Sequence, residues 1–301
     1  RRRSRAPAGH HPLPAMPPLC VFITGASSGL GEALARAYAA DGATVGLFAR
    51  REGELARVAE SIARRVPASL AEHALAADGG GAADSARNDS STIHGYAGDV
   101  RDAGALAAAA ADFIARHGAP DVVIANAGVS RGTLTEHPRD LAAFRAVFDT
   151  NVMGMVNTFA AFAASMQRAR AGTLVGIASV AGFRGLAGSG AYSASKSAAI
   201  TYLESLRLEM RPHGIAVVTI CPGYVGTAMT ARNPYRMPFK LEASVAAAKI
   251  TKAIARRRRF YVLPWPMAIV GALLRVLPRP IYDAMFAGAA RKPRVDDDAA
   301  R

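Results

Sequence analysis

The chain has 301 residues, a mass of 31.3 kDa and 51% hydrophobic residues, enough to bury a large core within one domain. Its net charge of +14 raises the question of a nucleic-acid binder, but no nucleic-acid-binding module is recognisable, and we exclude that class. The two cysteines, Cys20 and Cys221, lie in apolar runs and the histidines lack ligand spacing, which excludes a disulfide scaffold and a catalytic metal.

The first fifteen residues are basic and proline-rich, and no apolar segment follows their arginines. A secretory signal requires such a segment. We therefore expect residues 1–15 to be a disordered extension, the folded protein to begin at Met16, and the protein to be cytoplasmic.

The first apolar run, Leu19 to Thr24, is predicted to be a buried strand. It leads into T-G-A-S-S-G-L-G and then into a strong helix former. Gly25, Gly29 and Gly31 allow a tight turn and a close approach of the backbone to a pyrophosphate. The helix N-terminus offers its free N–H groups and positive dipole end to the phosphates. Strand, turn and helix in this order predict a dinucleotide site.

The second predicted strand, Thr44 to Phe48, ends in two arginines rather than the carboxylate that accepts the ribose 2′-hydroxyl of NAD. Guanidinium groups pair well with a 2′-phosphate, so Arg50 and Arg51 favour NADP(H) over NAD(H). Ser27 is expected to add a hydrogen bond to that phosphate. The alternative is that both arginines only begin a solvated helix.

Farther along, short apolar runs alternate with amphipathic stretches, which predicts a parallel sheet with helices on both faces. The further predicted strands are 92–96, 122–125, 173–178, 216–220 and 260–263, and a low-complexity stretch at about 70–91 is expected to be a flexible surface loop. After Pro138, apolar residues recur at helical spacing and are expected to be core: Leu141, Phe144, Val147, Phe148, Met155, Phe159 and Phe162.

Tyr192 and Lys196 form a Y-x-x-x-K motif, thirteen positions after Ser179. Residues four apart share one face of a helix, so the phenol and the ammonium lie side by side. A neighbouring cation favours phenolate, so we expect the pKa of Tyr192 to be lowered, which suits a general acid/base. The alternative is an exposed pair on a solvated helix.

After Pro222-Gly223, four side chains are expected to form an apolar lid that suits a hydrophobic substrate: Met229, Tyr235, Met237 and Phe239. The C-terminal segment, residues 264–301, begins with an apolar extension and ends in a polar tail. Only eleven residues separate Pro266 from Pro278, too few to span a membrane. Two readings remain: packing against the fold or a second subunit, which we favour, or an interfacial helix with a polybasic collar at Arg256–Arg259.

Together these motifs resemble the short-chain dehydrogenase/reductase family from about Leu19 to about Thr227. The family's T-G-x-x-x-G-x-G, N-A-G, Ser, Y-x-x-x-K and P-G elements occur in its order. The resemblance implies an α/β Rossmann-like doubly wound parallel sheet of about seven strands, in a single catalytic domain spanning 16–263. With the turn and the arginines, it implies a cofactor site of Gly25, Ser27, Ser28, Gly29, Leu30, Gly31, Arg50, Arg51, Asp99, Val100, Asn126, Ala127, Gly128, Tyr192, Lys196, Pro222, Gly223, Val225 and Thr227.

The resemblance also implies a catalytic tetrad of Asn151, Ser179, Tyr192 and Lys196. Ser179 would polarise a carbonyl while Tyr192 exchanges the proton. Lys196 would hold the nicotinamide ribose and Asn151 a water chain that resupplies protons. We therefore expect an NADP-dependent oxidoreductase acting on an apolar ketone or secondary alcohol, as a homodimer or homotetramer. The alternative is an NADP-binding sensor or scaffold without turnover, although such relatives tend to lose the tyrosine or the lysine.

Overall fold

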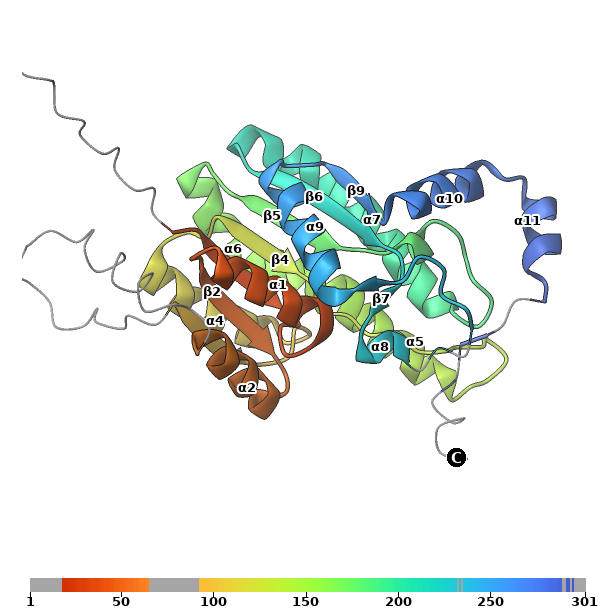
Figure 1. Cartoon of the computed structure of the whole chain (residues 1–301), viewed down its shortest axis with the longest axis horizontal. Coiled ribbons are helices and arrows are strands. Elements are labelled where there is room, and N and C mark those ends of the chain that lie inside the picture. Colours follow the sequence, from red (N-terminus) through yellow and green to blue (C-terminus); the bar gives the residue numbers. More distant parts are fainter. Residues whose placement is uncertain are drawn as a thin grey trace, which may run out of the picture.

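The structure, a computed structural model, describes residues 18–64, 92–231, 233, 235–288, 291–292 and 294. The expected disordered extension at 1–15 and the expected flexible loop at about 70–91 lie outside the described residues. The path of the described chain is drawn in Figure 1.

Seven parallel strands form one sheet in the order β3-β2-β1-β4-β5-β6-β9. Their bounds are β1 Cys20–Thr24, β2 Thr44–Ala49, β3 Ile93–Ala97, β4 Val122–Ala125, β5 Thr173–Ile177, β6 Ala216–Pro222 and β9 Phe260–Leu263. Every strand predicted from the sequence is present, and the predicted Rossmann-like fold is confirmed. From β1 the next strands in the chain, β2 and β3, are added on one side, and β4 and the strands after it are added on the other. The boundary between β1 and β4 is the switch point at which ligands bind in open α/β sheets.

Helices cover both faces of the sheet, because successive side chains of each strand point to opposite sides. On one side α1 Gly29–Ala40, α2 Glu52–Ala63 and α9 Ala243–Ala255 pack against residues such as Val21 and Ile23. On the other, α4 Ala103–His117, α6 Gly154–Ala169 and α7 Gly190–Met210 pack against residues such as Phe22. Asp102 caps α4 by accepting hydrogen bonds from the N–H groups of Gly104 and Ala105.

The helix after Pro138 is divided into α5 Asp140–Phe148, a π-helical turn Asp149–Met153, and α6. Val147, Met155, Phe159 and Phe162 are buried as predicted. The expectation was wrong for Leu141 and Phe144, which are 58% and 37% exposed, and Phe148 is only half-buried. The π turn contains more residues than an α turn, so it rotates the apolar stripe of α5 relative to that of α6.

The remaining elements follow the sheet's last strands. They are two 3₁₀ turns, Val180–Gly182 and Arg211–His213, a small pair of strands, β7 Val225–Gly226 and β8 Leu241–Glu242, and the helices α8 Ala228–Ala231, α10 Trp265–Val276 and α11 Arg279–Phe286. No helix among the described residues is both long and apolar enough to cross a bilayer. Figure 1 shows α10 and α11 at the end of the molecule far from α2.

Phe22 lies at the centre of one core, with four aromatic rings around it at centroid distances of 4.7–6.3 Å: Phe48, Tyr96, Phe113 and Phe162. We predict that Phe22→Ala lowers the free energy of unfolding by about 3–5 kcal/mol, because it removes a fully buried ring and leaves a cavity. Urea denaturation measures the loss. Leu208→Ala, on a side chain that is 66% exposed, is the control and should change stability by less than about 0.5 kcal/mol. Similar losses in both variants would contradict this account of the core.

Candidate active site

A cleft of about 340 Å³ opens at the carboxyl ends of the strands, at the point where the strand order reverses. It is lined by the turn between β1 and α1 and by residues that follow β2, β4, β5 and β6. Parallel strands bring all these ends to one edge of the sheet, so residues far apart in sequence meet there.

The turn between β1 and α1 contains three glycines, so no side chain of Gly25, Gly29 or Gly31 separates its backbone from the cleft. Gly25 and Gly29 have φ values of +68° and +60°, which favour glycine. A Cβ at Gly31 would lie 2.2 Å from the carbonyl oxygen of Gly25, so no other residue fits without moving the turn. The N–H of Gly25 donates to the carbonyl of Phe48 at 2.8 Å and ties the turn to the end of β2. This cradle fits a dinucleotide pyrophosphate approaching the N-terminus of α1.

Asn126 joins the ends of β1 and β4. Its side-chain amide donates to the carbonyl oxygens of Thr24 and Gly25, at 3.1 and 3.2 Å. Its backbone N–H donates to the hydroxyl of Thr24 at 3.2 Å, which in turn donates to the carbonyl of Ile124. These bonds tie the two strand ends together at the switch point of the sheet, so Asn126 positions the turn as well as lining the cleft.

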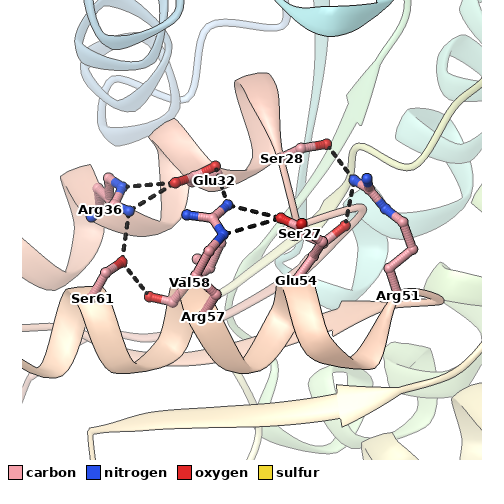
Figure 2. A network of polar contacts seen from close by, with 9 residues as sticks. All are labelled: Ser27, Ser28, Glu32, Arg36, Arg51, Glu54, Arg57, Val58 and Ser61. Atoms are coloured by element: carbon pink, nitrogen blue, oxygen red, sulfur yellow. Dashed lines mark hydrogen bonds and ion pairs between the residues drawn. The ribbon is translucent and has the colours of Figure 1, made fainter.

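Arg51 reaches from the end of β2 to the glycine turn (Figure 2). Its guanidinium donates to the hydroxyls of Ser28 at 2.9 Å and Ser27 at 3.2 Å. Arg50 instead lies 3.8 Å from the carboxylate of Asp99. The pKa of Asp99 is held below its usual value, mainly by the hydrogen bond from the Arg101 side chain. Arg51 and the hydroxyls of Ser27 and Ser28 thus meet at this end of the cleft.

Figure 2 also shows how α1 and α2 are fastened beside this end of the cleft. Arg36 of α1 donates to Glu32, one turn earlier, at 2.7 Å and to the hydroxyl of Ser61 of α2 at 2.7 Å. Arg57 of α2 lies 3.6 Å from the same Glu32 carboxylate. One salt bridge and one hydrogen bond between the two helices therefore hold α2, and with it Arg51, close to the turn.

The predicted catalytic side chains Ser179, Tyr192 and Lys196 all line the other end of the cleft. The Lys196 ammonium donates to the carbonyl of Ile177 at 2.8 Å and lies 5.9 Å from the centroid of the Tyr192 ring. Ser179 donates to the carbonyl of Pro222 at 3.4 Å, and its hydroxyl accepts from the N–H of Ala181. The end of β5 and the first turns of α7 thus place a hydroxyl, a phenol and an amine together.

Burial shifts the pKa values of two of these side chains, Tyr192 and Lys196. The pKa of Tyr192 is raised because burial disfavours phenolate more than the hydrogen bond with Ser179 favours it. The expectation that Lys196 lowers the pKa of Tyr192 was therefore wrong for this structure. Burial also lowers the pKa of Lys196 to about 8, so its own charge is costly here. A protonated phenol at neutral pH is a proton donor.

Asn151, on the π-helical turn, does not line the cleft but lies directly behind it. Its side-chain oxygen accepts from the N–H of Val129 at 2.8 Å, and its amide donates to the Val129 carbonyl and to the Ser195 hydroxyl. A Cβ on Gly128 would lie 3.2 Å from the Asn151 oxygen and 3.6 Å from the Lys196 nitrogen. The Asn151 oxygen and the Lys196 nitrogen thus both face the space that a side chain on Gly128 would fill.

All the predicted site residues line the cleft except Asp99 and Asn151. The sequence interpretation did not include several lining residues: Ala49, Gly98, Val129, Thr150, Ile177, Ala178, Ala228 and Thr230. A sequence pattern does not mark these residues as functional, since most of them have no polar side chain and contribute only backbone or methyl groups to the lining. Of the predicted apolar lid, Met229 lines the cleft, whereas Tyr235, Met237 and Phe239 are not among its described lining residues.

The C-terminal tail also reaches the site, in keeping with the expectation that the C-terminal segment packs against the fold, although the sequence analysis did not single out Lys292. The Lys292 ammonium lies 5.7 Å from the centroid of the Tyr192 ring and donates to the hydroxyl of Ser130 at 2.7 Å. Two residues later, Arg294 forms two hydrogen bonds with the buried carboxylate of Asp140, at 2.8 and 3.0 Å. A strong anchor therefore holds a second lysine near the tyrosine.

No group of three or more histidine, cysteine or carboxylate side chains able to hold a metal ion occurs in the part of the chain that the structure describes. Cys221 is buried and Cys20 half-buried, and both are free thiols. The polar groups that line the cleft are hydroxyl, phenol, amine, guanidinium, amide and backbone groups.

Comparison with known proteins gives a consistent result. A family model described as short chain dehydrogenase matches residues 19–80 and 70–236. A Myxococcus xanthus protein described as an uncharacterized oxidoreductase is 37% identical, covering 91% of this chain and 96% of the relative. Dehydrogenase/reductase SDR family member 7B from Bos taurus is 32% identical, covering 91% and 82%.

Two solved structures extend the likeness to the fold. A short-chain dehydrogenase/reductase from Burkholderia phymatum in complex with NAD has a TM-score of 0.70 and 25% identity, covering 92% of this chain and 97% of that one. A short-chain dehydrogenase from Sphingobium yanoikuyae in complex with NADPH has a TM-score of 0.69 and 20% identity, covering 92% and 98%.

The buried lysine predicts how stability depends on pH. Lys196 has a pKa of about 8 when folded, against a reference value of about 10.4 for an unfolded lysine. The unfolded chain binds more protons between these values, so the free energy of unfolding should rise with pH there, by roughly 3 kcal/mol in all. Denaturation at several pH values measures this rise. Lys196→Met should be more stable than the wild type at pH 7 and lack this part of the rise; the same pH dependence in both proteins would contradict the burial account.

Proposed function

Because the chain belongs to the short-chain dehydrogenase/reductase family and is an oxidoreductase of the NAD(P)-binding Rossmann type, we propose that it transfers a hydride between NADPH and an apolar ketone, or the reverse from a secondary alcohol. The observation that carries the proposal is the meeting of Ser179, Tyr192 and Lys196 at the end of a cleft whose other end is formed by Arg51 and the glycine turn.

The residues divide the work as follows. The nicotinamide, when bound, supplies or accepts the hydride. The substrate carbonyl oxygen would lie between Ser179 and Tyr192, where the serine hydroxyl polarises it and the phenol gives it a proton. The raised pKa of Tyr192 keeps that proton in place at neutral pH.

Proton resupply would pass behind the tyrosine. Lys196 has a pKa near 8, so it exchanges protons readily near neutral pH. Asn151 faces the same space beside Gly128 and is fixed by three hydrogen bonds, so it would hold the water that connects Lys196 to solvent. In the reverse direction the same groups would remove the alcohol proton.

The preference for NADP(H) is supported by the end of β2. Arg51 and the hydroxyls of Ser27 and Ser28 already lie within hydrogen-bonding distance of one another, so a 2′-phosphate would find a cation and two donors. Arg50 is partly engaged by Asp99, so we assign it the smaller role. The structure from Sphingobium yanoikuyae contains NADPH and that from Burkholderia phymatum contains NAD, so the family accepts both cofactors.

The lining of the cleft supports a mainly apolar substrate. Met229, Val129 and Ala228 contribute apolar side chains to the lining of the cleft, and Lys292 with Ser130 adds polar groups near Tyr192. A ketone with an apolar body and few polar groups fits this lining.

Assembly with a second copy is a further part of the proposal. Leu141 and Phe144 expose apolar surface on α5, and Phe144 stacks on Phe148 at 5.2 Å with nearly parallel rings. A homodimer or homotetramer that contacts α5 would bury this surface.

We predict that Tyr192→Phe keeps the fold and the affinity for NADPH but lowers kcat by at least about two orders of magnitude, because the proton donor is lost. Consumption of NADPH with a series of ketones of graded size is the measurement. Tyr202→Phe, another tyrosine of α7, is the matched control and should keep wild-type turnover. Near-normal turnover of Tyr192→Phe would contradict the assignment, and wild-type binding of NADPH without turnover on any ketone would favour a sensor.

We also predict that Arg51→Ala weakens binding of NADPH by about tenfold to a hundredfold, since a hydrogen bond to a charged group contributes about 1.5–3 kcal/mol. Binding of NADH, which lacks the 2′-phosphate, should change by less than about threefold. Fluorescence titration with both cofactors measures the difference, and Arg168→Ala, on the exposed face of α6, is the control. Equal losses for both cofactors would mean that Arg51 supports the turn and does not select the phosphate.

A further inference from the structure

The helix α10 exposes its apolar side. Four large side chains lie on one face at spacings of four, four and three residues: Trp265, Ile269, Leu273 and Val276. They are 74%, 53%, 62% and 78% exposed. We call these four residues the α10 stripe. A surface helix normally turns such a stripe toward the core, so a partner for it is to be sought outside the chain.

The opposite face of α10 fixes this orientation. Met267 is buried against Gly223, where an added Cβ would lie 3.0 Å from the methionine side chain. Gly271 lies so close to the Phe183 ring that an added Cβ would approach it within 2.4 Å. The guanidinium of Arg275, the only charged group of α10, lies 4.3 Å above the same ring. The helix therefore cannot roll to bury the α10 stripe without losing these contacts.

The next helix continues the pattern. Tyr282 holds α11 to the fold, because its hydroxyl donates to the carbonyl of Gly185 at 2.6 Å and the Arg184 guanidinium lies 4.4 Å from its ring. Ile281 and Met285, one turn apart, are left exposed. Each of the two C-terminal helices thus packs one face against the rest of the protein and exposes apolar side chains on another face.

Positive charge surrounds this surface. Arg256–Arg259 form an exposed turn immediately before β9, the edge strand that leads into α10, and Arg279 is exposed just beyond its end. On α9 and β9, a hollow of about 430 Å³ is lined by Lys249, Lys252, Arg256 and Arg258, with no carboxylate among its described lining residues. We call these four residues the basic hollow. Apolar and cationic groups therefore occur together at the β9 end of the sheet.

We propose that α10 and α11 dock this protein on the surface of an anionic lipid bilayer, with the α10 stripe inserted among the acyl chains and the basic hollow and the adjoining arginines against the lipid phosphates. An amphipathic helix with tryptophan on its apolar face and basic residues beside it is suited to that interface. α10 has twelve residues, too few to cross the bilayer, so it lies in the interface.

A second copy of the chain fits this surface less well. A twofold interface places the same patch of each subunit against its equivalent, so the arginine turns would approach one another. With a net charge of +14 and five exposed arginines beside the α10 stripe, that arrangement brings like charges together. An anionic bilayer is complementary in both charge and hydrophobicity. The proposal does not rest on the catalytic assignment.

Trp265 is the only tryptophan of the chain and lies on the α10 stripe, so its emission reports docking directly. We expect the full chain to show a blue shift that saturates with vesicles of mixed phosphatidylglycerol and phosphatidylcholine, and to sediment with them. Vesicles of phosphatidylcholine alone should bind at least about tenfold more weakly, because the charge contribution is then absent. High salt should weaken binding to the anionic vesicles.

Two double variants test the two parts of the surface while keeping Trp265 as the reporter. Ile269→Ser with Leu273→Ser should lower the affinity for anionic vesicles at least about tenfold, because the apolar insertion is lost. Lys252→Gln with Arg256→Gln should lower it at low salt and make the binding less dependent on salt, because two of the cations that face the lipid phosphates are lost. The matched controls are Leu208→Ser for exposed apolar surface and Arg168→Gln with Arg211→Gln for the change in charge, and both should bind as the wild type does.

Light scattering and circular dichroism on each variant establish its mass and fold. Wild-type vesicle binding by the Ile269/Leu273 variant would overturn the proposal. So would a Trp265 emission that is already blue-shifted without vesicles and reverts on dilution together with a fall in mass, since the α10 stripe would then be covered by a second copy. Turnover of ketones plays no part in these readouts, so failure of the catalytic proposal would leave this test intact.

Discussion

The parallel arrangement of the strands is the constraint on which the rest of the structure depends. It brings the carboxyl ends of β1, β2, β4, β5 and β6 to one edge, and the reversal of order between β1 and β4 separates the loops that follow them. Asn126 and Thr24 close this point with hydrogen bonds between the two strands. This arrangement of strand ends fixes the positions of three parts of the cleft relative to one another. They are the glycine turn, Arg51, and the pair Ser179 and Tyr192.

Burial decides the electrostatics within that frame. Tyr192 and Lys196 are both desolvated by burial, which raises the pKa of the phenol and lowers the pKa of the ammonium. Each shift favours the neutral form of the side chain. A neutral phenol beside a lysine with a pKa near 8 is a site whose protons are held in place yet exchange near neutral pH. At the other end of the cleft the Arg51 guanidinium donates hydrogen bonds to the hydroxyls of the turn, an arrangement that suits a phosphate. One cleft thus offers a proton donor at one end and a fixed cation at the other.

The C-terminal segment connects this cleft to the molecular surface. Met267 of α10 packs on Gly223, which lines the cleft, and Lys292 of the tail lies beside Tyr192. The same segment exposes the α10 stripe on its outer side. A docking surface would therefore be only one helix diameter from the residues that line the substrate end, so an apolar substrate dissolved in a bilayer would have a short path to the site.

The sequence by itself determined the seven strands and the glycine turn and, with the family resemblance, most of the residues of the cleft, because alternating apolar runs, glycine spacing and the Y-x-x-x-K motif are local signals. Tertiary structure alone decided three other matters. Burial reversed the expected shift in the pKa of Tyr192, and a π-helical turn left Leu141 and Phe144 exposed. The ion pair of Arg294 with Asp140, 154 positions apart, brought Lys292 to the site. Desolvation, helix rotation and long-range pairing depend on which surfaces meet, and no pattern along the chain records that.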